Sequence, residues 1–129
     1  MSIEIGLKGR AELVVAYENT AAAVGSGLVP VFATPSMIAL MEQAAASSLL
    51  PHLDDGQGSV GVHLDVSHDA ATPIGMKVWT ESEIIEVNGK QITFAVAAYD
   101  EAGLIGRGTH KRALISVDRF MSKVEQKKA

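Results

Sequence analysis

Three polar residues in this sequence, Thr34, Glu42 and His68, have the types needed for a hydrolytic site. Glu42 is the only charged residue between Ala33 and Leu53. If that segment is a helix, its polar side chains form one stripe, made up of Ser36, Gln43 and Ser47. Glu42 lies roughly 100° away from the stripe, because successive helical residues are about 100° apart. A carboxylate among apolar side chains costs free energy unless something uses it. The alternative is a glutamate at the margin of the buried face whose carboxylate reaches water.

His68 ends a run that is typical of a half-buried strand. The run from Ser59 to His68 alternates with period two, so that every second side chain shares a face. His68 falls on the same face as four apolar residues, namely Val60, Val62, Leu64 and Val66. It is therefore predicted to point toward the core, either as a hydrogen-bonded core residue or as an acid or base. A β-bulge within the run would invert this alternation.

Thr34 lies at the predicted start of the helix, just before Pro35. It is expected to cap the first amide groups, and proline suits the first helical position. Thr34 precedes Glu42 by eight residues, which corresponds to about 12 Å of helical rise. The same helix end offers unpaired amide groups and the positive end of the helix dipole, which could stabilise a developing oxyanion.

The elements that must position these residues are one long helix and about five strands. The helix is predicted from Thr34 to about Leu50, after a small-residue linker over 20–31. The strands are predicted over 11–19, 59–68, 77–87, 91–99 and 104–117, with Asn88-Gly89 as a hairpin signal. This pattern indicates an α+β domain in which an antiparallel sheet wraps around its helix. A helix so poor in charge cannot be solvated over most of its girth, so the sheet or a partner chain must cover it.

Composition narrows the class of protein. The 129 residues are predicted to form a single domain, 1–129, with a basic C-terminal tail at about 119–129. Zero cysteines exclude disulfides and thiolate chemistry. A net charge of −4 without a basic patch argues against nucleic acid. The absence of a long apolar run argues against a membrane span. The chain start lacks a secretory pattern, which predicts a cytoplasmic location.

Three segments of the sequence resemble the hotdog-fold thioesterases, specifically the fluoroacetyl-coenzyme A thioesterase-like branch. They are Phe32 to Glu42, Ser59 to His63 together with His68, and Gly106 to Arg112. The resemblance extends over roughly Leu7 to Phe120. It implies a hotdog fold, with a five-stranded antiparallel sheet around one long central helix. It also implies a homodimer or dimer of dimers whose sheets join edge to edge, with the acyl site at the interface.

The resemblance further implies an acyl-coenzyme A thioesterase that acts on a small or medium acyl group. Thr34, Glu42 and His68 would be its catalytic residues, and Gly61 would lie beside the thioester carbonyl. Glu42 would be the nucleophile or the base that activates water. Met37 and Met41 are expected to line the acyl pocket together with the 20–31 linker.

Other polar residues carry weaker predictions. The basic residues of the last strand are candidates for the coenzyme A phosphates, namely Arg107, Lys111 and Arg112, although charge runs of this size are usually solvated. His110 follows two strand glycines, Gly106 and Gly108, and this run is interpreted as structural. No metal site is predicted, because His63 and His68 face opposite ways on a strand. No cofactor is predicted, since a thiolate is a good leaving group without metal assistance.

Thioester hydrolysis has three alternatives among the functions that such a sequence could have. A non-catalytic acyl-coenzyme A binding or sensing module would keep the dimer and the pocket without turnover. A hotdog hydratase would carry the pattern Asp-x-Asn-Pro-x-His, and a serine hydrolase would carry Gly-x-Ser-x-Gly. Neither pattern occurs in the sequence.

Overall fold

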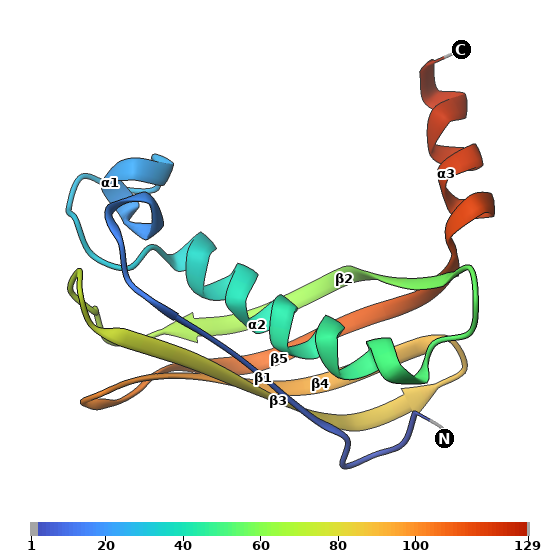
Figure 1. Ribbon diagram of the computed structural model, residues 1–129, viewed down its shortest axis with the longest axis horizontal. Coiled ribbons are helices and arrows are strands. Elements are labelled where there is room, and N and C mark those ends of the chain that lie inside the picture. The colour runs from blue at the N-terminus through green and yellow to red at the C-terminus, as the bar shows by residue number, and fades with distance from the viewer. Residues whose placement is uncertain (1–2, 129) are drawn as a thin grey trace.

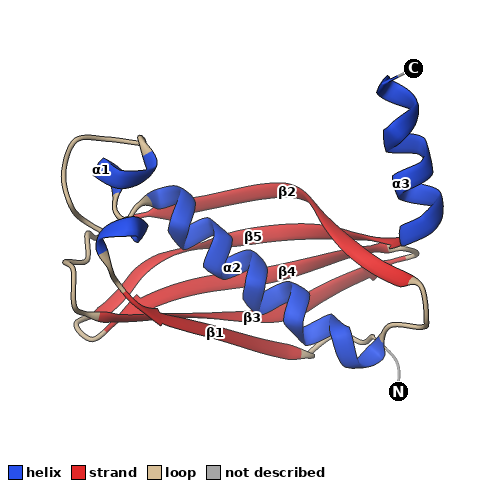
Figure 2. Cartoon of the chain, turned by 45° about the horizontal axis from the view of Figure 1, so that its top comes forward, coloured by secondary structure: helices blue, strands red, loops and turns tan. Residues whose placement is uncertain are grey.

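The computed structural model describes residues 3–128, and in that range five antiparallel strands curl around one long helix (Figures 1 and 2). The helix is α2 (Thr34–Leu49). The strands are β1 (Lys8–Val14), β2 (Gln57–His68), β3 (Lys77–Asn88), β4 (Gln91–Asp100) and β5 (Gly103–Ser116). Their order in the sheet is β1-β3-β4-β5-β2, so β1 and β2 form the two edges. The predicted α+β architecture is confirmed.

Small side chains allow α2 to lie close to the sheet. A Cβ atom on Gly9 would come within 2.9 Å of the Ser48 Cβ, and one on Gly106 would come within 2.9 Å of the Met37 sulfur. Thr80 donates a hydrogen bond of 2.8 Å from its hydroxyl to the Leu40 carbonyl, which ties the middle of the helix to β3. The core between helix and sheet is apolar and includes Met37, Met41, Phe94 and Ile105.

The predicted first strand is displaced in the structure. Residues 11–19 were expected to be a strand, but β1 ends at Val14 and Tyr17–Asn19 form a short 3₁₀ turn. Two side-chain hydrogen bonds close this turn. The Ala16 N–H donates to the Asn19 side-chain oxygen over 2.9 Å, and the Thr20 hydroxyl donates to the Tyr17 carbonyl over 2.6 Å. Side chains of this kind compete with strand pairing.

The long helix and the other four strands agree with prediction to within about two residues at each end. The linker contains a single helical turn, α1 (Ala21–Val24), which ends at Gly25 with φ of 84°. The hairpin between β3 and β4 turns at Gly89 and Lys90, one residue later than expected, because Asn88 still pairs with Gln91. Gly89 has φ of 63°, which suits the first position of a tight hairpin turn.

A β-bulge changes the faces of β2. Gly61 lies opposite Arg112, and the next paired residue, His63, lies opposite Lys111. Val62 is the extra residue and is 51% exposed. The predicted common face of Val60, Val62 and His68 is therefore wrong, since the inner face holds Gly61 before the bulge. Leu64, Val66 and His68 keep the inner face after it, opposite His110, Gly108 and Gly106.

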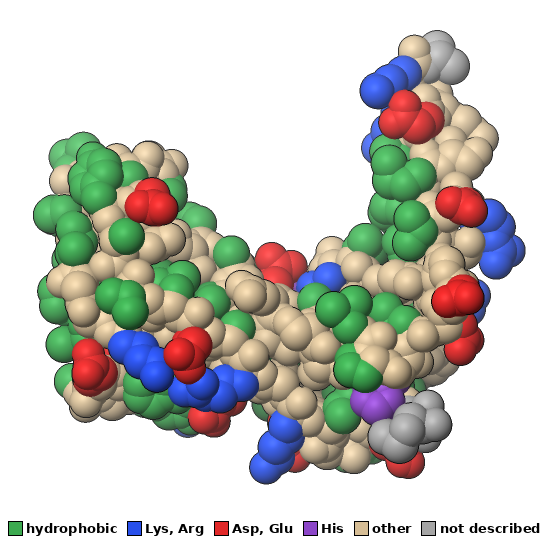
Figure 3. All heavy atoms as spheres, viewed as in Figure 1, with side chains coloured by type: hydrophobic (Ala, Val, Ile, Leu, Met, Phe, Trp, Pro, Cys, Tyr) green, Lys and Arg blue, Asp and Glu red, His purple; other side chains and the backbone are tan. Residues whose placement is uncertain are grey.

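Two short helical segments project past the β2 edge at opposite ends of the molecule. The α1 turn lies at one end, and α3 (Val117–Glu125) stands at the other, so the space-filling view has a notch between them (Figures 1 and 3). The predicted basic tail thus begins as a helix. Among the described residues, no helix combines the length and hydropathy that a bilayer crossing requires.

Candidate active site

Thr34 and His68 form a direct hydrogen bond. The Thr34 Oγ1 lies 2.8 Å from the His68 Nδ1. Thr34 is the first residue of α2, while the N-cap position belongs to Ala33, which has no capping side chain. The predicted capping role of Thr34 is therefore wrong, and its hydroxyl is instead directed to the sheet. The helix start itself keeps amide groups without carbonyl partners inside the helix.

The imidazole of His68 is held in a partly dry environment. Burial lowers the pKa of His68 below its ordinary value, so the neutral ring prevails at pH 7. Its Nε2 atom is buried and has no hydrogen-bond partner among the described residues, and the Phe32 ring packs edge-on at 6.5 Å between ring centroids. When Nδ1 carries the proton, it donates to Thr34, and the threonine hydroxyl proton is then free for another acceptor.

A hollow of about 280 Å³ opens beside this pair. Six residues of its lining are Ala21, Ser26, Val31, Phe32, Thr34 and His68. The predicted contribution of the 20–31 linker to a pocket thus has a physical counterpart. The rest of the lining is Asp69, Ala70 and Ala71, so the hollow combines small apolar side chains with the polar groups of Ser26, Thr34, His68 and Asp69. A hollow of this size, with few large side chains, suits a small acyl chain.

Glu42 lies in a second polar cluster, two turns further along α2. Its Oε2 atom is 3.6 Å from the Arg112 Nη1 and 3.9 Å from the His110 Nε2, and its side chain is 37% exposed. Gly61 faces the same carboxylate, since a Cβ atom built on Gly61 would collide with Glu42 Oε2. The carboxylate is thus positioned by groups of β2 and β5, with no side chain at residue 61 to cover it.

The hydrogen bonds around His110 define its protonation. The His110 Nδ1 lies 3.0 Å from the His63 carbonyl oxygen, so this nitrogen must donate. The His110 Nε2 lies 3.1 Å from the Arg112 Nη1 and must accept. His110 is therefore neutral. Burial, the largest cause, and the neighbouring Arg112 charge both lower the pKa of His110.

Arg112 is a buried guanidinium in which each of the three nitrogens has a hydrogen-bond partner. Its Nε donates to the Ser59 hydroxyl over 2.9 Å, and its Nη2 donates to the Ser59 carbonyl over 3.2 Å. Burial lowers the pKa of Arg112 from its ordinary value, and the Glu42 carboxylate opposes that change. Arg112 thus fixes one side of Glu42 in place.

The two clusters are too far apart within one chain to act on one carbonyl group. Thr34 and Glu42 are separated by about 12 Å of helix. Along β2, seven residues separate Gly61 from His68, or roughly 20 Å at strand spacing. Reacting atoms must approach to about 3–3.5 Å. The structure therefore brings together Thr34 with His68, and Glu42 with Gly61, but does not join the two pairs in one protomer.

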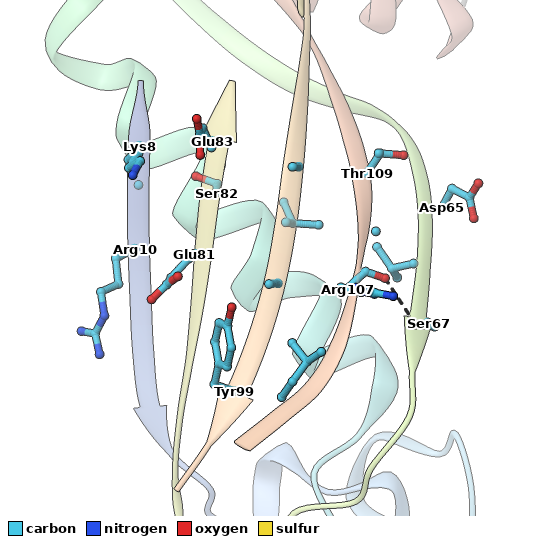
Figure 4. Close-up of a pocket in the computed structure, with 17 residues that line it drawn as sticks. Lys8, Arg10, Asp65, Ser67, Glu81, Ser82, Glu83, Tyr99, Arg107 and Thr109 are labelled. Carbon is cyan, nitrogen blue, oxygen red and sulfur yellow. Dashed lines mark hydrogen bonds between the residues drawn. The ribbon is translucent and has the colours of Figure 1, made fainter. Parts of the chain in front are cut away.

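The remaining predicted residues lie outside these clusters. Met37 and Met41 are fully buried in the core. Arg107 and Lys111 alternate with His110 and Arg112 along β5 and so lie on the outer face of the sheet. Arg107 borders a hollow of about 1160 Å³ on that face, together with Lys8 and Asp65 (Figure 4). The predicted phosphate-binding group is thus divided between two faces, since Arg112 faces α2.

The contacts of His110 and Arg112 with Glu42 are what the sequence alone did not indicate. Arg112 was predicted only as a candidate for the coenzyme A phosphates, and His110 was interpreted as structural. Their spacing of two residues on one strand was the available signal, because it places both side chains on one face. The bulge at Val62 hid the matching signal in β2. Strict alternation along β2 would place Gly61 on the face turned away from α2, but the bulge places it on the face that contacts Glu42.

Comparison with known proteins identifies the family. A family model described as fluoroacetyl-CoA-specific thioesterase matches residues 15–118. This chain belongs to that family. The predicted hotdog fold and the predicted enzyme class, a thioester hydrolase, are thereby confirmed.

Individual members of the family and fold agree with this assignment. The fluoroacetyl-CoA thioesterase of Streptantibioticus cattleyicolor is 43% identical over 97 residues, which cover 75% of this chain and 70% of that protein. A solved fluoroacetyl-CoA thioesterase structure has a TM-score of 0.94 and 34% identity, and the match covers 98% of each chain. A thioesterase superfamily member from Thermus thermophilus has a TM-score of 0.90 and 30% identity, with 98% and 93% of the two chains covered.

Proposed function

We propose that this protein hydrolyses a short-chain acyl-coenzyme A at sites shared between two protomers. The observation that carries the proposal is the division of the polar groups into two clusters within each chain. Each site would combine Glu42 and Gly61 of one protomer with Thr34 and His68 of the other. The catalytic unit is then a homodimer.

The free edge of β2 supports this arrangement. Strand β2 ends the sheet order and contributes twelve residues, a long row of backbone groups that can pair with another strand. Two copies of β2 paired antiparallel about a two-fold axis near the strand centre would set Gly61 opposite the second half of the partner strand. His68 of the partner would then lie nearer to Glu42 than His68 of the same chain does.

The proposed chemistry uses both clusters at one carbonyl. The thioester oxygen accepts hydrogen bonds from the Thr34 hydroxyl and from amide groups at the start of α2, which stabilise the oxyanion. His68 donates to Thr34 and keeps that hydroxyl directed at the substrate. Glu42 acts on the carbonyl carbon from the other side, and the carbon–sulfur bond breaks to release coenzyme A as the thiolate.

Glu42 can act in hydrolysis either as a general base or as a nucleophile. As a base, it takes a proton from the water that attacks the carbonyl carbon. As a nucleophile, its own oxygen attacks and forms an acyl anhydride that water then hydrolyses. A single turnover in ¹⁸O-labelled water tests for the anhydride. Label entering Glu42 demonstrates it, because water has then attacked the Glu42 carbonyl of the anhydride. Label in the released acid alone is the result of the base route and also of water attack on the acyl side of the anhydride.

The size of the hollow beside Thr34 favours a short acyl group. About 280 Å³ is near the lower end of the range for small-molecule pockets. Relatives of this chain have been solved with fluoroacetate and CoA and with acetyl-CoA, which agrees with two-carbon acyl groups. The cytoplasmic location stays a prediction.

The test of the function is thiol release from a series of acyl-CoA esters, from acetyl and fluoroacetyl to octanoyl. We expect short esters to be hydrolysed, and we expect Glu42→Gln and His68→Gln each to abolish most of the turnover. Binding of the esters without thiol release by the parent protein would instead establish a non-catalytic binding module. Parent rates in both variants would contradict the assigned residues.

A further inference from the structure

The helix α3 carries an apolar face that the other residues of the described range 3–128 leave exposed. Four apolar side chains recur at the spacing of one helical face, namely Val117, Phe120, Met121 and Val124. They are 36–45% exposed, and no residue of α3 is buried. The space-filling view shows hydrophobic side chains on the flank of α3 that borders the notch (Figure 3). A helix of nine residues is marginal in water on its own, so this face needs a packing partner.

The base of α3 is fixed beside the start of β2. Ser116, the residue before α3, pairs with Gln57, and the Val117 amide donates to the Gly56 carbonyl over 2.9 Å. A Cβ atom on Gly58 would lie 3.1 Å from a Val117 methyl group, so the helix is seated closely on the strand. These contacts hold α3 at the Gln57 end of the β2 edge.

The other end of β2 carries a second apolar surface, which we name the α1 segment (residues 21–30). It lies beside the hollow that contains Thr34 and His68, because Ala21 and Ser26 line that hollow. The sequence has no charged residue from Thr20 to Met41. Val24, Leu28 and Val29 are 46%, 96% and 57% exposed, which is unusual for side chains of this kind gathered in one segment.

The α1 segment and α3 project to the same side of the sheet at opposite ends of β2 (Figures 1 and 2). In an antiparallel β2–β2 dimer, the start of one β2 lies beside the end of the other. We infer that α3 of each protomer packs its apolar face on the α1 segment of its partner, where it forms an outer wall of the partner's acyl pocket. This inference rests on the dimer put forward in the proposed function.

The occupant is a second copy of this chain because the two surfaces match in kind and in place. Both are apolar, both lie next to the edge that the dimer would join, and a two-fold axis brings them together twice. The α3 face would then be covered by the same association that completes the catalytic site.

Cross-linking tests the contact directly, since the chain has no cysteine of its own. Two variants, Leu28→Cys and Phe120→Cys, are co-expressed with different tags and treated with a short bismaleimide. We expect a cross-linked species that carries both tags. Ser122→Cys, on the polar side of α3, replaces Phe120→Cys in the matched control and should cross-link far less.

Analytical sedimentation, measured in parallel, shows whether the protein is a monomer or a dimer and so distinguishes the possible cross-linking results. A dimer without the Leu28–Phe120 cross-link would overturn the α3 contact and leave the proposed dimer standing. A monomer would overturn both. Cross-linking of Leu28→Cys to itself would place the two α1 segments together and would also overturn the contact.

A kinetic comparison connects the contact with the pocket. Met121→Asp places a charge in the apolar face and should raise the KM for a short acyl-CoA, whereas Ser122→Asp adds the same charge outside it and should leave the KM near the parent value. Equal KM values for the two variants would overturn the assignment of α3 as a pocket wall.

Discussion

Gly61 is the residue at which a single added atom most directly reaches the site. A Cβ atom there would collide with Glu42 Oε2 and lie 3.0 Å from the His110 Cε1. Its backbone is that of an ordinary strand, because its φ is not positive. The glycine is thus explained by the space that Glu42 occupies.

We predict that Gly61→Ala lowers kcat/KM strongly while the fold persists. The carboxylate is the end of a flexible side chain and can move aside, so the change in unfolding free energy should stay within about 1 kcal/mol. A displacement of the carboxylate by about 1 Å could cost on the order of 100-fold in rate. Thiol-release kinetics and urea unfolding measure the two effects. Parent activity in a folded variant would show that the position of Glu42 does not limit the reaction.

Arg112 and Arg107 belong to the same strand but differ in surroundings, which makes them a matched pair for stability. Arg112→Met removes the donors to Ser59 and His110, and we expect a loss of about 1–3 kcal/mol. Arg107→Met, at an exposed position, should change stability by less than about 0.5 kcal/mol. Urea unfolding of the two variants checks this. Equal stabilities would contradict a structural role for the buried guanidinium.

Residue-level prediction succeeded where a side chain broke a clear local pattern. Glu42 stood out because it was alone among apolar helical residues, and His68 because it ended an alternating run. The contacts of His110 and Arg112 with Glu42 and Ser59 were not predicted, since these partners lie far away in sequence. The pairing of Thr34 with His68 likewise depends on how β2 meets the start of α2.

At the scale of elements, α2 and β2 together set the spacing of the two clusters. The helix was predictable because its charge-poor composition and its flanking prolines are local signals. The bulge in β2 was not predictable, because it depends on pairing with β5. The 3₁₀ turn after β1 was not predictable either, because it depends on the hydrogen bonds of the Asn19 and Thr20 side chains. The bulge matters most for function, since it turns Gly61 toward Glu42.

The contact between β2 and β5 through His110 should make stability depend on pH. Burial lowers the pKa of both His110 and His68 from the ordinary 6.5, so the unfolded chain binds these protons more tightly than the folded chain does. Their contribution is complete above about pH 6.5 and is lost as the pH falls below it. We expect the urea midpoint to be lower at pH 5.5 than at pH 7.5.

The variant His110→Gln separates this effect from acid destabilisation in general. Its stability should fall less between pH 7.5 and 5.5 than that of the parent, whatever its absolute stability. His68 would account for a remaining part of the slope. An unchanged slope would mean that the pKa of His110 is the same in the folded and unfolded chains, which would contradict the effect of burial.

At the scale of the whole molecule, three features lead to the same association. The β2 edge is free, the polar clusters are divided, and the apolar faces of α3 and the α1 segment lie at opposite ends of that edge. The family resemblance predicted a dimer with the acyl site at the interface, whereas the local patterns alone predicted only that the sheet or a partner must cover the helix. The separation of the two polar clusters within one chain indicates which residues each protomer would contribute to a shared site.

Complementation between two inactive variants tests the shared site most directly. Glu42→Gln and His68→Gln are each purified, then unfolded and refolded together in equal amounts, and thiol release is measured. If each site takes Glu42 from one protomer and His68 from the other, a heterodimer has one intact site. About a quarter of the parent activity should then return, because half of randomly assorted dimers are heterodimers with one working site of two. If the mixture, once heterodimers are verified, stays as inactive as each variant alone, the shared site is contradicted.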